Sequence, residues 1–332
     1  MIPSIKTIRE RCKLISKDKP ITIITPIKRY LGFSAPVSPV DQLSKIAEIW
    51  GVPFAAKDPQ RLIIKLTNNQ KPLIYDEQGP IDGSVFYGFG HETLDRLMVR
   101  FVIAALEKIG KKVINGEKAL TVADDKGLMA LALANHPEVP TAFSVIGSAR
   151  GNVKLILKLL NVKESRNNQV IQKLTGFSAG GVGTQPLPAT IDHLAPALWA
   201  SRMDTRPRVI QNDVDGSKSG EPRKVIRAYV VGGRIVGCYI TEGYGIVNCA
   251  GLARESQGYI YTPTPVQRKA FLAAAKAVGA SGFCRIDASG GKKFVIYEIN
   301  PLARIDAEKY GLHIPEELLW YAVNIATQSS YV

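Results

Sequence analysis

The sequence has few of the features that mark membrane proteins, secreted disulfide-rich proteins or zinc ribbons. Its 332 residues include only four cysteines and four histidines, and no two cysteines form a Cys-x-x-Cys pair. This scatter argues against a disulfide framework or a zinc ribbon, so we expect reduced and mostly buried thiols. No apolar run approaches the roughly 18–20 residues that cross a bilayer, and residues 1–19 lack the apolar core of a signal peptide. We therefore expect a cytoplasmic protein without a membrane partner.

Positive charge is in excess. The chain has 43 Lys and Arg residues against 29 Asp and Glu residues, which gives a formal net charge of +14. Such an excess favours an anionic partner, for example a nucleotide or an acidic substrate. No run of five or six like charges occurs and no aromatic–basic RNA motif is present, which argues against nucleic acid. A basic surface that is merely solvated is the alternative.

The order of strand-like and helix-like segments predicts an α/β protein. The strands that we expect in the first third lie at 21–25, 61–66, 72–75, 84–87 and 112–114. Amphipathic helices are expected between them at 42–50 and 92–109. Strands that alternate with helices predict a mostly parallel sheet, and the runs at 61–66 and 72–75 are apolar enough to be buried strands.

Later segments predict further helices and antiparallel strands. Residues 124–135 and 265–278 are expected to be helical, and 314–327 forms a last helix. Strand-like runs at 224–231 and 234–239 are joined by Gly232-Gly233, which is typical of a tight hairpin turn.

A glycine-rich segment follows an apolar strand that ends near Lys173. Residues 176–183 contain four glycines and one serine. Glycines let the backbone approach a polyphosphate so that several N–H groups point at its oxygens, and the preceding lysine supplies a point charge. No Gly-Lys-Ser/Thr follows, so the segment is not a Walker loop. A glycine-rich hairpin without a ligand is the alternative.

Two short patterns near the end of the chain could hold a metal ion. Arg285-x-Asp287 and Glu298-x-Asn300 each lie at the end of a predicted strand. Strand residues two apart share a face, and a hairpin would return Asp287 to Glu298 and Asn300. Three hard oxygen donors suit magnesium, and we expect the clustered carboxylates to repel each other when no ligand is bound. A solvated hairpin end is the alternative.

Together these patterns resemble the ATP-grasp enzymes, most closely the carboxylate–amine ligases that include the ribosomal-protein glutamate ligase and the glutathione synthetase-like family. Further segments with the same order are Val113-Ile114-Asn115, Asp125-Lys126, Val139-Pro140-Thr141, 209–214, 226–233 and 310–314. The resemblance covers about residues 110 to 325. It implies an N-terminal α/β pre-ATP-grasp domain (1–118) followed by a two-lobed ATP-grasp fold of α+β character. The lobes would be a central subdomain with a glycine-rich flap (119–212) and a C-terminal subdomain with a metal site (213–332).

The resemblance also implies roles for individual residues, with ATP and Mg²⁺ or Mn²⁺ as cofactors. The nucleotide contacts that it implies are Lys126, Lys173, Gly176, Ser178, Gly180, Gly181, Gln211, Asn212 and Val214. The metal ligands that it implies are Asp287, Glu298 and Asn300. Arg285 would face the transferring phosphoryl group, and Arg227 and Arg304 are candidates for the substrate carboxylate or the tetrahedral oxyanion. For each arginine, a surface ion pair is the alternative.

The implied reaction is amide-bond formation between a carboxylate, activated as an acyl phosphate, and an amine or amino acid such as glutamate, with release of ADP and phosphate. We expect small-molecule or peptide substrates, and the basic excess favours anionic ones. Alternatives are a D-alanine-type peptide ligase, an ATP-dependent phosphotransferase, and a non-catalytic basic protein that binds nucleotides or nucleic acid. The sequence leaves the oligomeric state open, a homo-oligomer included.

Overall fold

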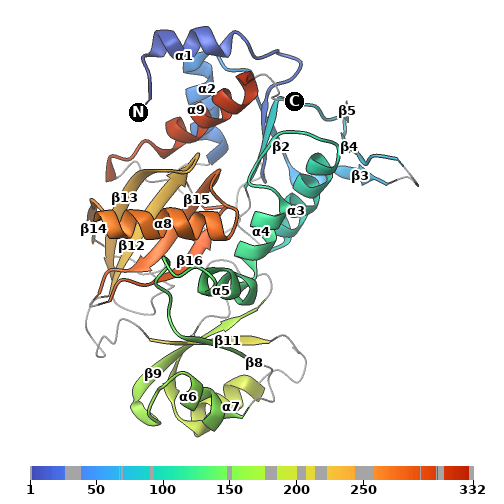
Figure 1. The fold of residues 1–332 in the computed structure, drawn as a ribbon. Coiled ribbons are helices and arrows are strands. Elements are labelled where there is room, and N and C mark those ends of the chain that lie inside the picture. Colours follow the sequence, from blue (N-terminus) through green and yellow to red (C-terminus); the bar gives the residue numbers. More distant parts are fainter. Residues whose placement is uncertain are drawn as a thin grey trace.

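The computed structural model describes residues 2–26, 39–66, 68, 70–89, 93–147, 152–175, 185–199, 207–213, 223–243, 257–291, 293–303, 305 and 310–328. Three parts follow one another along the molecule (Figure 1). The N-terminal part contains a parallel sheet and also receives the last helix of the chain. A five-stranded sheet lies in the middle, and a four-stranded sheet with two helices forms the far end.

The N-terminal sheet is wholly parallel, as the sequence predicts. Its strands are β1 (Ile21–Ile24), β2 (Phe54–Lys57), β6 (Val85–Gly88) and β7 (Val113–Ile114), in the order β2-β1-β6-β7. The helices around it are α1 (Ile5–Cys12), α2 (Pro39–Trp50), α3 (Thr93–Lys108) and α9 (Ile314–Thr327). Every residue of β1 and β6 is buried, which is typical of parallel strands covered on both faces.

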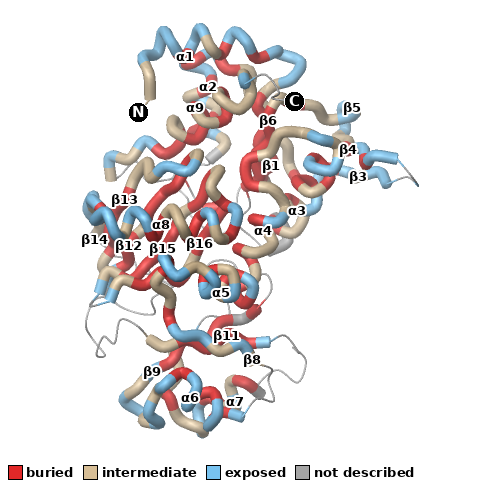
Figure 2. Tube along the Cα trace, in the orientation of Figure 1, coloured by how far each residue is buried: buried red, intermediate tan, exposed pale blue. Residues whose placement is uncertain are grey.

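A small antiparallel sheet projects from this part (Figure 2). It consists of β3 (Ile63–Lys65), β4 (Leu73–Asp76) and β5 (Gly79–Pro80), and the short 3-10 helix η1 (Pro59–Arg61) precedes it in the chain. Ile63 and Leu66 are 69% and 77% exposed, so the prediction of a buried strand at 61–66 is wrong. Only one side of the hairpin faces the core, through Leu62 and Ile74. An apolar run therefore indicated a strand but not its burial.

Two helices, α4 (Glu117–Asp124) and α5 (Lys126–Ala134), precede the far part in the chain, and Ala119, Met129 and Leu133 from them join the core of the middle sheet. The far part itself contains an antiparallel sheet. Its elements are β8 (Ser144–Gly147), α6 (Val153–Leu159), β9 (Ser165–Leu174), β10 (Gln185–Ala189), α7 (Ile191–Trp199) and β11 (Arg208–Asn212). The strand order is β10-β9-β11-β8. Helices α6 and α7 bury one face of this sheet around Val170 and Ile210.

The helix predicted at 124–135 corresponds to α5, and a second helix that was not predicted, α4, ends just before it. Asp125 has an extended backbone and separates α4 from α5. Its carboxylate accepts hydrogen bonds from the backbone N–H groups of Gly127 and Leu128 at 2.8 and 3.0 Å. Aspartate at this N-cap position satisfies donors that have no partner in the helix, so it begins a new helix at Lys126.

The middle sheet is antiparallel and has the order β14-β13-β12-β15-β16. Its elements are β12 (Arg223–Val231), β13 (Arg234–Gly243), β14 (Gln257–Ile260), α8 (Pro265–Ala277), β15 (Phe283–Ser289) and β16 (Ile296–Asn300). Gly232 and Gly233 have φ values of 55° and 72°, which confirms the predicted tight turn between β12 and β13.

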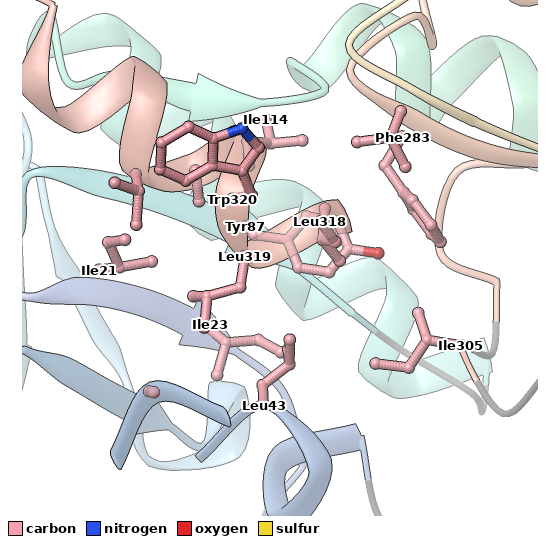
Figure 3. Close-up of a cluster of buried hydrophobic side chains, with 14 of the residues drawn as sticks. Ile21, Ile23, Leu43, Tyr87, Ile114, Phe283, Ile305, Leu318, Leu319 and Trp320 are labelled. Atoms are coloured by element: carbon pink, nitrogen blue, oxygen red, sulfur yellow. The ribbon is translucent and has the colours of Figure 1, made fainter. Parts of the chain in front are cut away.

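One apolar core joins the N-terminal part to the middle sheet (Figure 3). Leu318, Leu319 and Trp320 of α9 belong to the same cluster as Ile23 of β1 and Phe283 of β15. The side-chain amide of Asn115 also bonds both the N–H and the carbonyl of Phe283. Each sheet lies within one of the three predicted ranges, but α4 crosses position 118, and the division itself stays a prediction. Within the described residues no helix is long and apolar enough to cross a membrane.

Candidate active site

Alternate residues of the middle sheet place polar side chains on one face. The register aligns Tyr239, Arg227, Asp287 and Glu298 across β13, β12, β15 and β16. The next row aligns Tyr229, Arg285 and Asn300. Residues directly opposite on neighbouring strands lie within side-chain reach. The structure thus brings together five of the residues singled out in the sequence, namely Arg227, Arg285, Asp287, Glu298 and Asn300.

Each carboxylate in this group has its own cation. Arg285 donates two hydrogen bonds to Asp287, from Nε at 2.8 Å and from Nη2 at 3.0 Å. Lys126 Nζ lies 2.6 Å from Glu298 Oε1, and the lysine comes from α5 rather than from the sheet. The expectation that these carboxylates repel each other is therefore wrong, because fixed cations compensate both of them.

Lys173 joins the two sheets at this point. It lies at the end of β9, and its Nζ donates to the backbone carbonyl of Tyr297 on β16 at 3.2 Å. The same ammonium is 5.6 Å from the centre of the Tyr297 ring. Burial lowers the pKa of Lys173 to about 8, an effect that Glu298 opposes and Lys126 reinforces. Lys173 is therefore a buried cation that is largely protonated at pH 7.

Burial alone would raise the pKa of Glu298. The ammonium groups of Lys126 and Lys173 and the guanidinium of Arg285 outweigh that effect, so its pKa lies below the ordinary range. Lys126, Lys173, Arg227 and Arg285 supply four positive charges, whereas Asp287 and Glu298 supply two negative ones. A face with this surplus of two positive charges is suited to a polyanion.

Arg227 lies beside a group of tyrosines that the sequence did not indicate. Its guanidinium carbon is 6.0 Å from the centre of the Tyr239 ring, which stacks on Tyr310 at 4.2 Å and on Tyr229 at 6.2 Å. Burial and the nearby Arg285 lower the pKa of Arg227, but Asp287 and Tyr239 raise it and the net shift is upward. Its Nε is buried without a hydrogen-bond partner among the described residues. Tyr239 and Tyr229 face Arg227 because they occupy the same parity in their strands, which was the available signal.

The predicted nucleotide residues on β11 face in opposite directions. Gln211 pairs with Ile171 and so shares the face of Lys173, and its Nε2 donates to Ser144 Oγ at 2.8 Å. Asn212 donates instead to the carbonyl of Leu160, at the end of α6, at 3.0 Å. Contacts from Asn212 to a nucleotide would therefore involve its backbone. The remaining candidates lie outside the described residues: Gly176, Ser178, Gly180, Gly181, Val214 and Arg304.

The donor set fits magnesium better than zinc. No group of three or more His, Cys, Asp or Glu side chains gathers in the part of the chain that the structure describes. Asp287, Glu298 and Asn300 instead supply two carboxylates and one amide from paired strands. Magnesium is typically bound through one or two carboxylates together with the phosphates of a substrate. The surplus of positive charge around these donors is compatible with such phosphates.

No family model and no curated protein matches the sequence. Solved structures do match. The ATP-grasp ligase PsnB complexed with a minimal precursor has a TM-score of 0.65 at 15% identity, covering 94% of this chain and all 100% of that one. D-alanyl-alanine synthetase A from Vibrio cholerae O1 biovar eltor str. N16961 has a TM-score of 0.64 at 13% identity, over 94% and 99%.

A third structure, the macrocyclase MdnC bound with precursor peptide MdnA from Microcystis aeruginosa MRC, has a TM-score of 0.62 at 15% identity, over 92% and 99%. The chain therefore has the fold of the ATP-grasp ligases over nearly its whole length. This confirms the fold that the sequence motifs implied, an α/β N-terminal part followed by a two-lobed ATP-grasp fold.

Proposed function

We propose that the chain is an ATP-dependent carboxylate–amine ligase. The observation that carries the proposal is the charged face of the middle sheet, where Lys126 from α5 and Lys173 from β9 lie beside Glu298, next to the Arg285–Asp287 pair. A face that combines surplus positive charge with paired carboxylates suits a triphosphate bound with magnesium. The site occurs in a fold shared with ATP-grasp ligases.

The charged residues of the site would have separate roles in binding the nucleotide, the metal and the transferring phosphoryl group. Lys126 and Lys173 would neutralise the phosphates, and Arg285 would stabilise charge on the transferring phosphoryl group. Asp287, Glu298 and Asn300 would hold magnesium, which when bound polarises the phosphoryl oxygens. Burial of these groups favours water exclusion, which an acyl phosphate requires.

In the proposed reaction an oxygen of the substrate carboxylate attacks the γ-phosphorus of ATP. The bond between that phosphorus and the β–γ bridging oxygen breaks, and ADP leaves. The nitrogen of the amine then attacks the acyl carbon, the carbon–oxygen bond to phosphate breaks, and the nitrogen loses a proton. Arg227 is the candidate for holding the substrate carboxylate, because its buried Nε–H has no partner among the described residues.

ADP formation with paired panels of acids and amines tests the proposal. The acids should include peptides with side-chain carboxylates, because PsnB and MdnC are described in complexes with precursor peptides. We expect ADP to appear only when a suitable acid and amine are both present, together with an amide product. A phosphorylated product without an amine requirement would instead identify a phosphotransferase. Absence of nucleotide binding would contradict the proposal altogether.

A further inference from the structure

The residues proposed for the metal are held by residues proposed for the phosphates. Lys126 lies 2.6 Å from Glu298 Oε1, and Arg285 makes two hydrogen bonds to Asp287. Both carboxylates therefore have a cation against them when no ligand is bound. The pair on Glu298 is the more informative, because Lys126 lies on α5 and Glu298 on β16, 172 residues apart in the sequence.

The position of Lys126 is fixed by its helix. Lys126 is the first residue of α5, directly after the N-cap Asp125. A Cβ on the next residue, Gly127, would lie only 3.1 Å from the Thr175 side chain, so the start of α5 packs closely against the end of β9. Two residues after Gly127, Met129 Sδ accepts a hydrogen bond from the N–H of Ile299 on β16 at 3.4 Å. The helix is thus anchored on both lobes, with Lys126 beside Glu298.

A second Lys–Glu pair on the same sheet provides a comparison. Lys224 Nζ lies 2.9 Å from Glu242 Oε1, but these side chains are 44% and 28% exposed. The Lys126 and Glu298 side chains are 6% and 21% exposed. Water screens the first pair much more than the second, so only the Lys126 ammonium strongly opposes a second cation at its carboxylate.

We propose that Lys126 is a positioning residue whose ammonium group pairs with the Glu298 carboxylate and so hinders binding of a free divalent metal ion. When nucleotide phosphates bind, the ammonium pairs with them instead and the carboxylate becomes available to the metal. This inference rests on the proposed function. A metal ion that binds Glu298 alone must displace an ammonium or lie beside it, and the repulsion between them weakens binding. Nucleotide phosphates give the ammonium another anionic partner, so they remove that obstacle. Metal and nucleotide would therefore each strengthen the binding of the other.

The test measures free Mn²⁺ by electron paramagnetic resonance while Mn²⁺ is titrated into the full-length protein, with and without AMPPNP. Four proteins are compared: wild type, Lys126→Gln, Lys126→Arg and Lys224→Gln. Circular dichroism and thermal melting verify that each variant is folded. Lys126→Arg keeps the charge and therefore tests the role of the cation if Lys126→Gln does not fold.

We expect weak Mn²⁺ binding to nucleotide-free wild type, and binding about tenfold to a hundredfold tighter for nucleotide-free Lys126→Gln. Lys126→Arg and Lys224→Gln should behave as wild type without nucleotide. AMPPNP should strengthen Mn²⁺ binding to wild type more than to Lys126→Gln, which a purely structural role of Lys126 would not produce.

Equal Mn²⁺ affinity of nucleotide-free wild type and Lys126→Gln would overturn the role of Lys126, while nucleotide-dependent binding in wild type would leave the proposed function standing. Should Lys126→Gln not fold, loose metal binding by nucleotide-free Lys126→Arg supports the role and binding clearly tighter than wild type overturns it. Failure of wild type to bind Mn²⁺ even with AMPPNP would contradict the proposed function and with it this inference.

Discussion

The two faces of the middle sheet are made by alternate residues of the same strands, yet the area under α8 and the area that carries the candidate site differ in chemistry. On one face Ile226, Ala228, Cys284 and Ile286 pack against α8 in an apolar cluster. On the other face Arg227, Arg285, Asp287 and Glu298 form the charged group. Neighbours in sequence therefore have opposite environments. Substitutions under α8 should therefore change stability with little effect on the proposed chemistry, whereas substitutions in the charged group should affect both.

Glu298→Gln should have the largest effect, and it acts on the charged face. The substitution keeps the shape but removes an anionic oxygen from the proposed metal site, so ATP-dependent turnover should fall by about two to four orders of magnitude. The free energy of unfolding should also fall, because Lys126 and Lys173 lose their common counterion.

Steady-state ADP release and urea unfolding measure the two effects of Glu298→Gln. Lys224→Gln, which removes a more exposed ion pair on the same sheet, is the control and should retain its turnover. Near-full ligation by Glu298→Gln would mean that the hairpin is structural.

Phe271→Ala tests the apolar face. Phe271 of α8 is fully buried and meets Phe294 edge to face at a centroid distance of 5.3 Å. Its truncation should lower the free energy of unfolding by about 3–5 kcal/mol, as measured in urea. Calorimetry at low temperature should nevertheless give an AMPPNP affinity close to that of wild type. An affinity loss as large as that of Glu298→Gln would show that the two faces are not separable.

Gly258→Ala should have a smaller effect on the free energy of unfolding. A Cβ at Gly258 on β14 would clash with the Tyr310 ring, which stacks on Tyr239 beside Arg227. The ring must shift, and we expect a loss of about 1–3 kcal/mol in unfolding free energy. Tyr310→Leu together with Gly258→Ala should recover part of that loss. No recovery in the double variant would mean that the clash lies elsewhere.

The smallest expected effect is a change in the number of protons taken up on nucleotide binding, and it tests the role of Lys173. With a pKa of about 8, Lys173 is largely neutral at pH 9 when no ligand is bound. Phosphates would raise that pKa, so nucleotide binding at pH 9 should take up about one proton and weaken as the pH rises above 8. Calorimetry in buffers of different ionisation enthalpy measures the uptake. Lys173→Arg keeps a cation that stays charged at pH 9, so this variant should bind nucleotide without the uptake, and uptake that persists in it would point to another group.

Much of this contrast between the two faces of the middle sheet can be predicted from the sequence. Alternation in 283–289 and 296–300 predicts which residues share a face, and Gly232-Gly233 predicts the hairpin. The pairing of Lys126 with Glu298 could not be predicted, because it joins a helix and a strand that are far apart in the chain. The repulsion expected between carboxylates failed for that reason: sequence spacing placed the acids together but gave no position for the cations.

The excess of basic residues gave only partial information about the charge of the substrate. Arg9 donates two hydrogen bonds to the carbonyl of Ile49 at the end of α2. Lys112 donates to the carbonyls of Ile325 and Gln328 at the end of α9, and the Arg11 guanidinium lies 5.8 Å from the centre of the Trp320 ring. Cations at helix C-termini satisfy free carbonyls. These positive charges therefore stabilise helices, and composition alone cannot distinguish them from charges that bind a substrate.

The most direct test of the central claim, that the charged face binds a magnesium–nucleotide complex, is the change in unfolding free energy on adding AMPPNP with Mg²⁺. A ligand at about 100 times its Kd stabilises a protein by about 2.7 kcal/mol. We predict stabilisation of this size for wild type and Lys224→Gln at such a concentration, and its near-complete loss in Glu298→Gln and Lys173→Met. Equal stabilisation of all four proteins, or none in wild type, would show that the charged face does not bind a magnesium–nucleotide complex.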